Sequence, residues 1–222
     1  MVKAKICGLS EPVSLRAAID AGADAVGFVF FPPSPRAVDA ERAAELAGLA
    51  ENAMRVGLFV EPDDETLETI LKTVPLDLLQ LHGKETPDRV AEIRRNTGLP
   101  VMKAVSLRTA ADLDAVPAYE EKADWLLFDA KPPAGAGLPG GNGVSFDWRL
   151  LQNRRWRCPV MLSGGLDAAN LAEAVAITGI GWVDVSSGVE SAPGQKDIGR
   201  IRDFLRIAHG LEGTPPAAEK ET

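Results

Sequence analysis

Histidine and cysteine are scarce in this chain, whose 222 residues include two of each. The cysteines, Cys7 and Cys158, are too few for a disulfide framework in a chain of this length. Neither falls in a metal-ligand spacing, and only His82 and His209 are available as histidine ligands. The sequence therefore predicts neither a disulfide framework nor a zinc site.

Long apolar runs and an excess of positive charge are also missing. No apolar run approaches the roughly 18 residues that a membrane-spanning helix needs. The first residues lack the apolar core and cleavage site of a secretory signal. The formal net charge of −8 argues against a nucleic acid or an anionic membrane as partner. We expect a cytoplasmic protein, to which an anionic small molecule could still bind through a few local donors.

Strand-like runs alternate with helix-like segments along almost the whole chain. Such alternation indicates parallel strands joined by right-handed crossovers. Eight units in about 210 residues fit a closed (βα)8 barrel, the TIM barrel, better than an open doubly wound sheet. We expect one barrel over residues 1–209 and a flexible tail over residues 210–222, which are polar and contain prolines. The strand-like runs begin near Lys3, Ala25, Met54, Asp77, Pro100, Asp124, Pro159 and Trp182.

Capping residues predict where three of the helices begin. Ser10 is expected to cap a helix that starts at Pro12. The acidic residues at 63–65 favour a helix start because they complement the helix dipole. Thr86 followed by Pro87 is typical of a cap and a first helical residue.

Two loops are longer than usual for a connection from strand to helix. One covers residues 31–36, is rich in proline and carries one cation, Arg36. The other covers residues 131–143 and is rich in glycine and proline. Loops of this kind are usually functional lids or else disordered. Both follow strands, so both are expected on the catalytic face of the barrel.

Cys7 and Asp129 each end a strand-like run, and both are candidates for proton transfer. A thiolate at the end of a barrel strand can serve as a base or nucleophile, although an unpaired cysteine is often a small buried hydrophobe. Asp129 follows the apolar run 125–128, where partial desolvation would raise its pKa toward values useful for a general acid. The alternative for Asp129 is the capping of a turn.

Small residues end the seventh and eighth runs, at Gly164-Gly165 and at Ser186-Ser187-Gly188. Such residues let backbone amides approach a phosphate closely, and the loops after strands 7 and 8 form a phosphate site in many barrels. The alternative is a pair of plain tight turns.

Three further side chains are candidate ligands of a substrate. The Arg36 guanidinium could take a carboxylate in a bidentate pair, or it could be solvated. His82 could hydrogen-bond a ligand or close a turn. Asp184 points either into the barrel or toward the helices, and an inward carboxyl would need a partner. Cys158 precedes Pro159 at the start of a strand and is expected to be structural.

Taken together, these segments resemble phosphoribosylanthranilate isomerase of tryptophan biosynthesis, over about residues 3 to 207 and in the right order. The resemblance implies a (βα)8 barrel that carries out an Amadori rearrangement of N-(5-phosphoribosyl)anthranilate to 1-(2-carboxyphenylamino)-1-deoxyribulose 5-phosphate, without metal or organic cofactor. The matching segments are Lys5-Ile6-Cys7-Gly8, Gly27-Phe28-Val29-Phe30, Ser34-Pro35-Arg36, Gln80-Leu81-His82-Gly83, Phe128-Asp129, Gly141-Asn142-Gly143, Phe146-Asp147-Trp148, Leu162-Ser163-Gly164-Gly165-Leu166 and Asp184-Val185-Ser186-Ser187-Gly188-Val189-Glu190.

The resemblance also assigns roles. Cys7 matches the general base, Asp129 the general acid, and Arg36 the residue that holds the anthranilate carboxylate. The glycine and serine turns match the phosphate-binding loops. Ser163 stands where the commoner family residue is Ala, and its hydroxyl could add a hydrogen bond to phosphate. A helix N-terminus around residues 10–12 is a plausible means of lowering the pKa of Cys7.

Three alternative functions differ from this isomerase in the chemistry that they require. A pentose phosphate epimerase would need metal-binding residues that this chain lacks, and an aminoaldose isomerase would carry Asp where this chain has Cys7. A regulatory barrel that binds a phosphosugar without catalysis is a third alternative. As partners we expect a phosphosugar substrate and no nucleic acid or membrane, with the chain a monomer or a weak homodimer.

Overall fold

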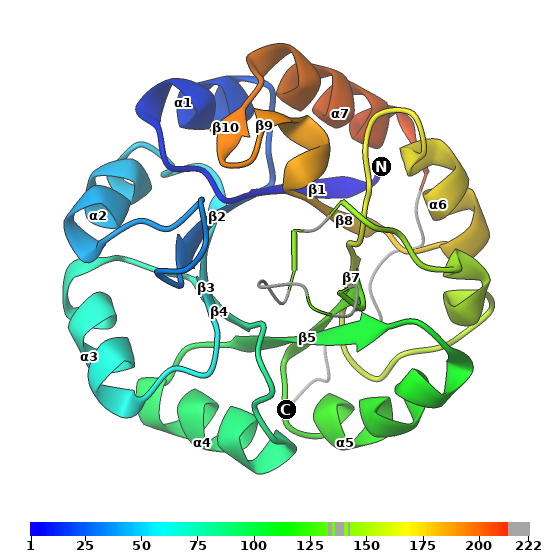
Figure 1. The fold of residues 1–222 in the computed structure, drawn as a ribbon, viewed down its shortest axis with the longest axis horizontal. Coiled ribbons are helices and arrows are strands. Elements are labelled where there is room, and N and C mark those ends of the chain that lie inside the picture. The colour runs from blue at the N-terminus through cyan, green and yellow to red at the C-terminus, as the bar shows by residue number, and fades with distance from the viewer. Residues whose placement is uncertain (133–134, 136–139, 142, 213–222) are drawn as a thin grey trace.

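Eight parallel strands close into a barrel in the order of the sequence, β1 to β8 (Figure 1). The computed structural model describes residues 1–132, 135, 140–141 and 143–212. Every strand begins within one residue of its predicted start, so the prediction of a (βα)8 barrel is confirmed. The strands are β1 (Lys3–Cys7), β2 (Ala25–Phe30), β3 (Met54–Phe59), β4 (Leu78–Leu81), β5 (Val101–Leu107), β6 (Trp125–Ala130), β7 (Val160–Leu162) and β8 (Trp182–Val185).

The helices surround this barrel (Figure 1). Between β6 and β7 the described residues form the 3-10 helix η2 (Trp148–Leu151) and no α-helix, so the sixth of the eight units differs from the others. The α-helices are α1 (Pro12–Asp20), α2 (Ala40–Gly48), α3 (Asp64–Thr73), α4 (Pro87–Thr97), α5 (Val116–Glu120), α6 (Leu171–Thr178) and α7 (Ile198–Gly210), and the other 3-10 helices are η1 (Ala110–Ala115) and η3 (Ser187–Val189).

Two of the three predicted helix starts are confirmed. The side chain of Asp63 accepts a hydrogen bond from a backbone amide in the first turn of α3, and Thr86 does the same for α4. The prediction that Ser10 caps α1 is wrong, because Glu11 occupies the N-cap position. Pro12 is the first helical residue and restricts the residue before it to an extended conformation, which places the helix boundary at Glu11.

The barrel interior has an apolar layer at one end and polar side chains at the other. Successive inward residues lie two apart along a strand. Moving along β4 from Leu78 therefore brings Gln80 and then His82 into the same interior, and moving along β8 from Trp182 brings Asp184. The apolar layer consists of Ala25, Val56, Leu78, Met102, Ala104, Leu127, Met161 and Trp182.

A short hairpin that was not predicted follows β8. Its strands β9 (Glu190–Ala192) and β10 (Gln195–Lys196) pair antiparallel. At the turn between them, Gly194 has a positive φ, and a Cβ atom there would lie 2.5 Å from the carbonyl oxygen of Pro35. The hairpin thus packs closely on the loop that carries Arg36, and a side chain at position 194 would push the two apart.

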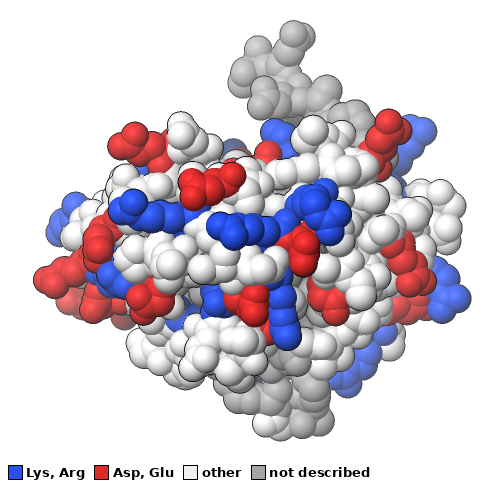
Figure 2. Space-filling view, turned by 90° about the horizontal axis from the view of Figure 1, so that it is seen from above, with Lys and Arg blue, Asp and Glu red and all other residues white. Residues whose placement is uncertain are grey.

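The two ends of the described chain meet at the amino end of the barrel. The amide of Val2 donates to the carbonyl of Leu211 at 3.0 Å, so the first residues of the predicted tail, 210 and 211, belong to the folded unit. Residues 213–222 of that tail lie outside the described residues. Among the described residues, no helix is long and apolar enough to cross a membrane. Figure 2 shows acidic and basic side chains interspersed over one face.

Candidate active site

A pocket lies at the carboxyl ends of the barrel strands and gathers almost every side chain that the sequence singled out. Both long loops contribute to its wall, the first through Arg36 and the second through Gly140 and Gly141. Positions 133–134, 136–139 and 142 of the second loop lie outside the described residues. The predicted site residues that line the pocket are Cys7, Arg36, His82, Asp129, Gly164, Gly165, Asp184, Ser186 and Ser187.

Gly188 is the predicted site residue that does not line this pocket. A Cβ atom at this position would collide with the carbonyl oxygen of Leu166. The glycine is therefore needed because the loops after β7 and β8 pack against each other there.

Cys7 ends β1 and is buried. It lies against Gly27 of β2, where a Cβ atom would be 2.9 Å from its Sγ. Burial raises the pKa of the Cys7 thiol, and the ammonium groups of Lys5 and Lys196 act in the opposite direction. The net direction is therefore upward, and buried lysines supply positive charge that opposes it. The expected contribution of the α1 N-terminus stays a prediction.

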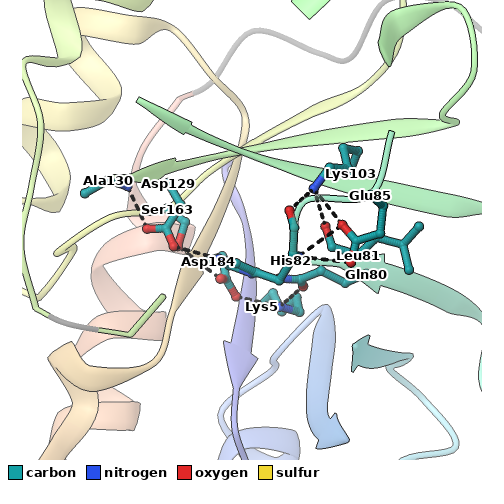
Figure 3. A network of polar contacts seen from close by, with 11 residues as sticks. Lys5, Gln80, Leu81, His82, Glu85, Lys103, Asp129, Ala130, Ser163 and Asp184 are labelled. Carbon is teal, nitrogen blue, oxygen red and sulfur yellow. Dashed lines mark hydrogen bonds and ion pairs between the residues drawn. The ribbon is translucent and has the colours of Figure 1, made fainter. Parts of the chain in front are cut away.

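Lys5 lies two residues before Cys7 on the same face of β1 and is completely buried. Its Nζ donates to Oδ1 of Asp184 and to Oε1 of Gln80, both at 2.8 Å (Figure 3). Asp184 therefore points into the barrel, and Lys5 is the partner that an inward carboxyl requires. The other oxygen of Asp184, Oδ2, accepts from the Ser163 hydroxyl at 3.1 Å. That hydroxyl therefore donates to Asp184 in this structure, and the hydrogen bond to phosphate expected for Ser163 stays a prediction.

Asp129 lies two residues after Leu127 on β6 and therefore also faces the interior. Its Oδ1 accepts from the amide of Ala130 at 2.8 Å, and its Oδ2 lies 3.0 Å from Nε2 of His82. The other ring nitrogen of His82, Nδ1, is 2.9 Å from Nε2 of Gln80. His82 and Asp129 are therefore one hydrogen-bonded pair rather than two separate ligand contacts.

Arg36 is buried and paired with Glu190 of the hairpin. Its Nε and Nη2 donate to the two carboxylate oxygens of Glu190 at 2.7 and 2.8 Å. A bidentate pair was expected with a substrate carboxylate. The edge of the guanidinium formed by Nε and Nη2 instead makes such a pair with a carboxylate of the protein. The Nη1 edge is turned toward Gly141, where a Cβ atom would lie 2.7 Å from Nη1. A side chain at position 141 would block this edge.

Lys196 connects Glu190 to the loop after β8. Its buried Nζ contacts a carboxylate oxygen of Glu190 at 2.7 Å and the carbonyl oxygen of Ser186 at 2.9 Å. Burial itself raises the pKa of Glu190, but its bonds to Arg36 and Lys196 dominate, so the net pKa is lowered and the carboxylate stays ionised. The hairpin therefore fixes both the Arg36 side chain and one predicted phosphate loop.

The loop after β7 presents backbone amides to the pocket. Gly164 and Gly165 both have positive φ, and no described residue accepts a hydrogen bond from either amide. A Cβ atom at Gly165 would lie 2.7 Å from backbone atoms of Val144, so the glycines also allow close packing of neighbouring loops. Unpaired amides at the end of a barrel strand are suited to bind an anion.

Four residues of this site were not predicted as such: Lys5, Gln80, Glu190 and Lys196. The spacing of two residues that places Lys5 beside Cys7, and Gln80 beside His82, was available in the sequence. The hairpin carrying Glu190 and Lys196 gave no such signal, because its short strands have no apolar alternation. Among the described residues, no cluster of three or more His, Cys, Asp or Glu side chains could hold a metal ion.

The arrangement suits acid and base chemistry on an anionic ligand. A thiol and a carboxyl face one pocket from β1 and β6, an arginine stands at one side, and free amides stand at another. Such a site can transfer protons to and from a bound molecule while charged groups hold its ends.

Comparison with known proteins agrees with this chemistry. A family model described as N-(5'phosphoribosyl)anthranilate (PRA) isomerase matches residues 4–206. The N-(5'-phosphoribosyl)anthranilate isomerase of Paramagnetospirillum magneticum is 60% identical over 210 residues, which cover 94% of this chain and 98% of that protein.

Solved structures extend the likeness to the fold. The phosphoribosyl anthranilate isomerase of Thermotoga maritima superposes with a TM-score of 0.85 at 36% identity, covering 95% of this chain and all of that one. A phosphoribosyl anthranilate isomerase in complex with reduced 1-(o-carboxyphenylamino)-1-deoxyribulose 5-phosphate gives a TM-score of 0.82 at 35% identity, with 95% of this chain covered and 100% of that one. The chain described here belongs to the N-(5'-phosphoribosyl)anthranilate isomerase family.

Proposed function

We propose that this protein converts N-(5-phosphoribosyl)anthranilate to 1-(2-carboxyphenylamino)-1-deoxyribulose 5-phosphate, a step of tryptophan biosynthesis, with Cys7 as general base and Asp129 as general acid. The observation that carries the assignment of roles is that both side chains line one pocket, from strands on different sides of the barrel. A sugar that binds between them is within reach of both groups.

The reaction begins with proton transfer from Asp129 to the ring oxygen of the ribose, which opens the ring to a Schiff base. The cationic nitrogen of the Schiff base acidifies the proton on C2′. Cys7 as a thiolate removes that proton and leaves an enolamine, which tautomerises to the ketone. Every step is a proton transfer or a shift of electrons within the substrate, so no metal or redox cofactor is needed.

Cys7 must lose its proton before it can act as a base. Because burial raises its pKa, most molecules carry a neutral thiol at neutral pH. The positive charges of Lys5 and Lys196 favour the thiolate and so increase the active fraction. We therefore expect kcat/KM to rise as the pH increases from neutral into the mildly alkaline range.

The charged ends of the substrate have separate sites in this proposal. The Nη1 edge of Arg36 holds the anthranilate carboxylate, while Glu190 keeps the guanidinium in place through its other edge. The amides of Gly164 and Gly165, together with Ser186 and Ser187, hold the phosphate. Asp184 lines the pocket nearby and is proposed to meet the sugar hydroxyls.

The direct test is turnover of freshly made N-(5-phosphoribosyl)anthranilate by the purified protein, followed by fluorescence, with and without EDTA. We expect the substrate to be consumed at the same rate in both. Absence of turnover would contradict the proposed activity, and a rate lost in EDTA would contradict chemistry without a metal.

The protein's cellular setting follows from the same proposal. A step of amino-acid biosynthesis favours a cytoplasmic enzyme, which cell fractionation would test. The state of monomer or weak homodimer remains a prediction that light scattering across a concentration series would test.

A further inference from the structure

A continuous chain of hydrogen bonds runs through the barrel from Lys5 to Asp129 (Figure 3). It passes from Nζ of Lys5 to Gln80 at 2.8 Å, from Gln80 to His82 at 2.9 Å, and from His82 to Asp129 at 3.0 Å. All four side chains are buried, with exposed fractions of 0 to 8%. The proposed base lies beside the first member of the chain, and the proposed acid is its last.

The ammonium group of Lys5 fixes the direction of this chain. An ammonium can only donate, so the atom of Gln80 that faces it must be the carbonyl oxygen. Although burial itself lowers the pKa of Lys5, its ion pair with Asp184 and its interaction with Cys7 raise the net pKa, so the group stays charged. The orientation of the Gln80 amide, often ambiguous in proteins, is thereby determined.

The same reasoning determines which ring nitrogen of His82 carries the proton. Since Oε1 of Gln80 faces Lys5, its NH₂ group faces Nδ1 of the imidazole, and an NH₂ group can only donate. Nδ1 must accept and therefore carries no proton. A neutral imidazole then has its proton on Nε2, which faces Oδ2 of Asp129.

From these contacts we infer that Lys5, Gln80 and His82 form a directed chain of positioning residues that holds His82 as the neutral Nε2–H tautomer and makes it a permanent donor to Oδ2 of Asp129. The acid is thereby oriented, and its transferable proton must leave from a position other than the one His82 occupies. Lys5 serves both catalytic groups, the base as a neighbouring charge and the acid through this chain. The functional part of the inference rests on the proposed role of Asp129.

A second cation holds the backbone on either side of His82. Nζ of Lys103 donates to the carbonyl oxygens of Leu81 and Gly83 at 3.2 and 2.8 Å, and to Glu85 at 2.9 Å. These carbonyls belong to the residues immediately before and after His82. With its backbone clamped from the helix side and its ring held between Gln80 and Asp129, the imidazole has little freedom to reverse the chain (Figure 3).

The first test is the tautomer itself, read from long-range ¹H–¹⁵N correlations of histidine-labelled protein at pH 8. The chain has two histidines, so His209→Gln assigns both signals. We expect Nε2 of His82 to carry the proton and Nδ1 to be bare. A proton on Nδ1, or two tautomers in exchange, would overturn the inference. This measurement needs neither substrate nor activity, so its outcome is independent of the proposed isomerase function.

Reversing one link provides the second test. Gln80→Glu keeps the shape and still accepts from Lys5, but its carboxylate cannot donate to Nδ1. The variant should move a proton onto Nδ1, and an unchanged tautomer would overturn the inference. Gln152→Glu, at an exposed position, is the matched control and should leave the spectrum unchanged. If Gln80→Glu does not fold, the wild-type tautomer still decides the question.

The consequence for catalysis is tested by two substitutions of His82. His82→Gln retains an N–H donor near the position of Nε2, whereas His82→Leu retains none. Loss of one hydrogen bond to the acid predicts that kcat falls about tenfold in His82→Leu and recovers most of that loss in His82→Gln. Equal losses in both variants would show that the ring only fills space and would overturn the catalytic part of the inference.

Discussion

Replacing Lys5 with Met should make Cys7 much harder to ionise. Lys5→Met preserves most of the side-chain volume in a completely buried position and removes the positive charge beside the thiol. Burial raises the pKa of Cys7, and Lys5 is the first of the charged neighbours that oppose it. Without that charge, fewer molecules carry a thiolate at a given pH.

The size of the effect follows from how close the two side chains lie. A Cβ atom at Gly27 would be 2.9 Å from Sγ of Cys7 and 3.2 Å from Cε of Lys5, which places these atoms at most about 6 Å apart. At that separation one unit charge contributes about 2 to 3 kcal/mol in an effective dielectric of about 20. Asp184 repels the thiolate and cancels part of the stabilisation that Lys5 provides. A net effect of about 1.4 kcal/mol corresponds to a tenfold lower thiolate population.

The assay is alkylation of Cys7 by iodoacetamide, followed by mass spectrometry of the Cys7 peptide. At pH 8 the rate in Lys5→Met should be about tenfold lower than in the wild type. Lys3→Met is the matched control, because Lys3 lies on the same strand but is exposed at its other end. An equal rate in Lys5→Met and wild type would refute the electrostatic argument.

Loss of Lys5 also leaves Asp184 buried without its ion pair, which could itself disturb the fold. The pair Asp184→Asn and Lys5→Met/Asp184→Asn removes the buried carboxylate from both variants, and Lys5 in Asp184→Asn keeps its hydrogen bond to Gln80. The double variant should alkylate more slowly than Asp184→Asn alone. Equal rates in this comparison would refute the argument as well.

Three further predictions concern other parts of the molecule. Asp129→Asn should lower kcat by about a hundredfold or more, because an amide cannot deliver the ring-opening proton, and near-normal turnover would remove Asp129 from the mechanism. Arg36→Met should raise KM for the anthranilate-bearing substrate, and a fall in kcat alone would contradict the carboxylate site. Asp112→Ala should destabilise the protein by about 1 kcal/mol in urea unfolding at pH 7, because Asp112 accepts from the amide of Thr109 at the start of η1. The pKa of Asp112 is lowered to about 2, chiefly by this bond, so its contribution is present above its ordinary value of 3.8 and is lost as the pH falls toward 2. An equal difference between variant and wild type at pH 7 and pH 2 would contradict that account.

The barrel could be predicted because its signal is local and repeated. Each strand is a short apolar run followed by small or polar residues, and the error in each predicted start is one residue at most. The sixth unit broke this regularity: after β6 the described chain contains η2 and no α-helix before β7. A loop rich in glycine and proline carries no helical periodicity. The missing α-helix after β6 could therefore be seen in the composition of the loop, but not by counting strand and helix units.

The site could be predicted only as far as strand ends could be located. Cys7, His82, Asp129 and Asp184 were found because each lies within one residue of the end of a strand. Their partners were harder to predict, since the pairing of Lys5 with Asp184 joins residues 179 positions apart. Such pairs are determined by closure of the barrel, which brings β1 beside β8.

Arg36 and Cys7 show how burial changed two specific expectations. The guanidinium was expected to await a substrate, but Glu190 occupies one edge of it because a buried cation requires a partner. The thiol was expected to be activated by a helix terminus alone, and the structure adds two further positive charges, those of Lys5 and Lys196. Neither Glu190 nor Lys196 could be placed without the hairpin that follows β8.

The central claim is that Cys7 removes the C2′ proton. The most direct measurement compares Cys7→Ala with wild type in single-turnover isomerisation and in binding of reduced 1-(o-carboxyphenylamino)-1-deoxyribulose 5-phosphate. We predict that turnover falls at least about a hundredfold while the Kd of this analogue changes only severalfold, because the base acts in the transition state and contributes little to binding. Turnover close to that of the wild type, with the analogue still bound, would contradict the claim.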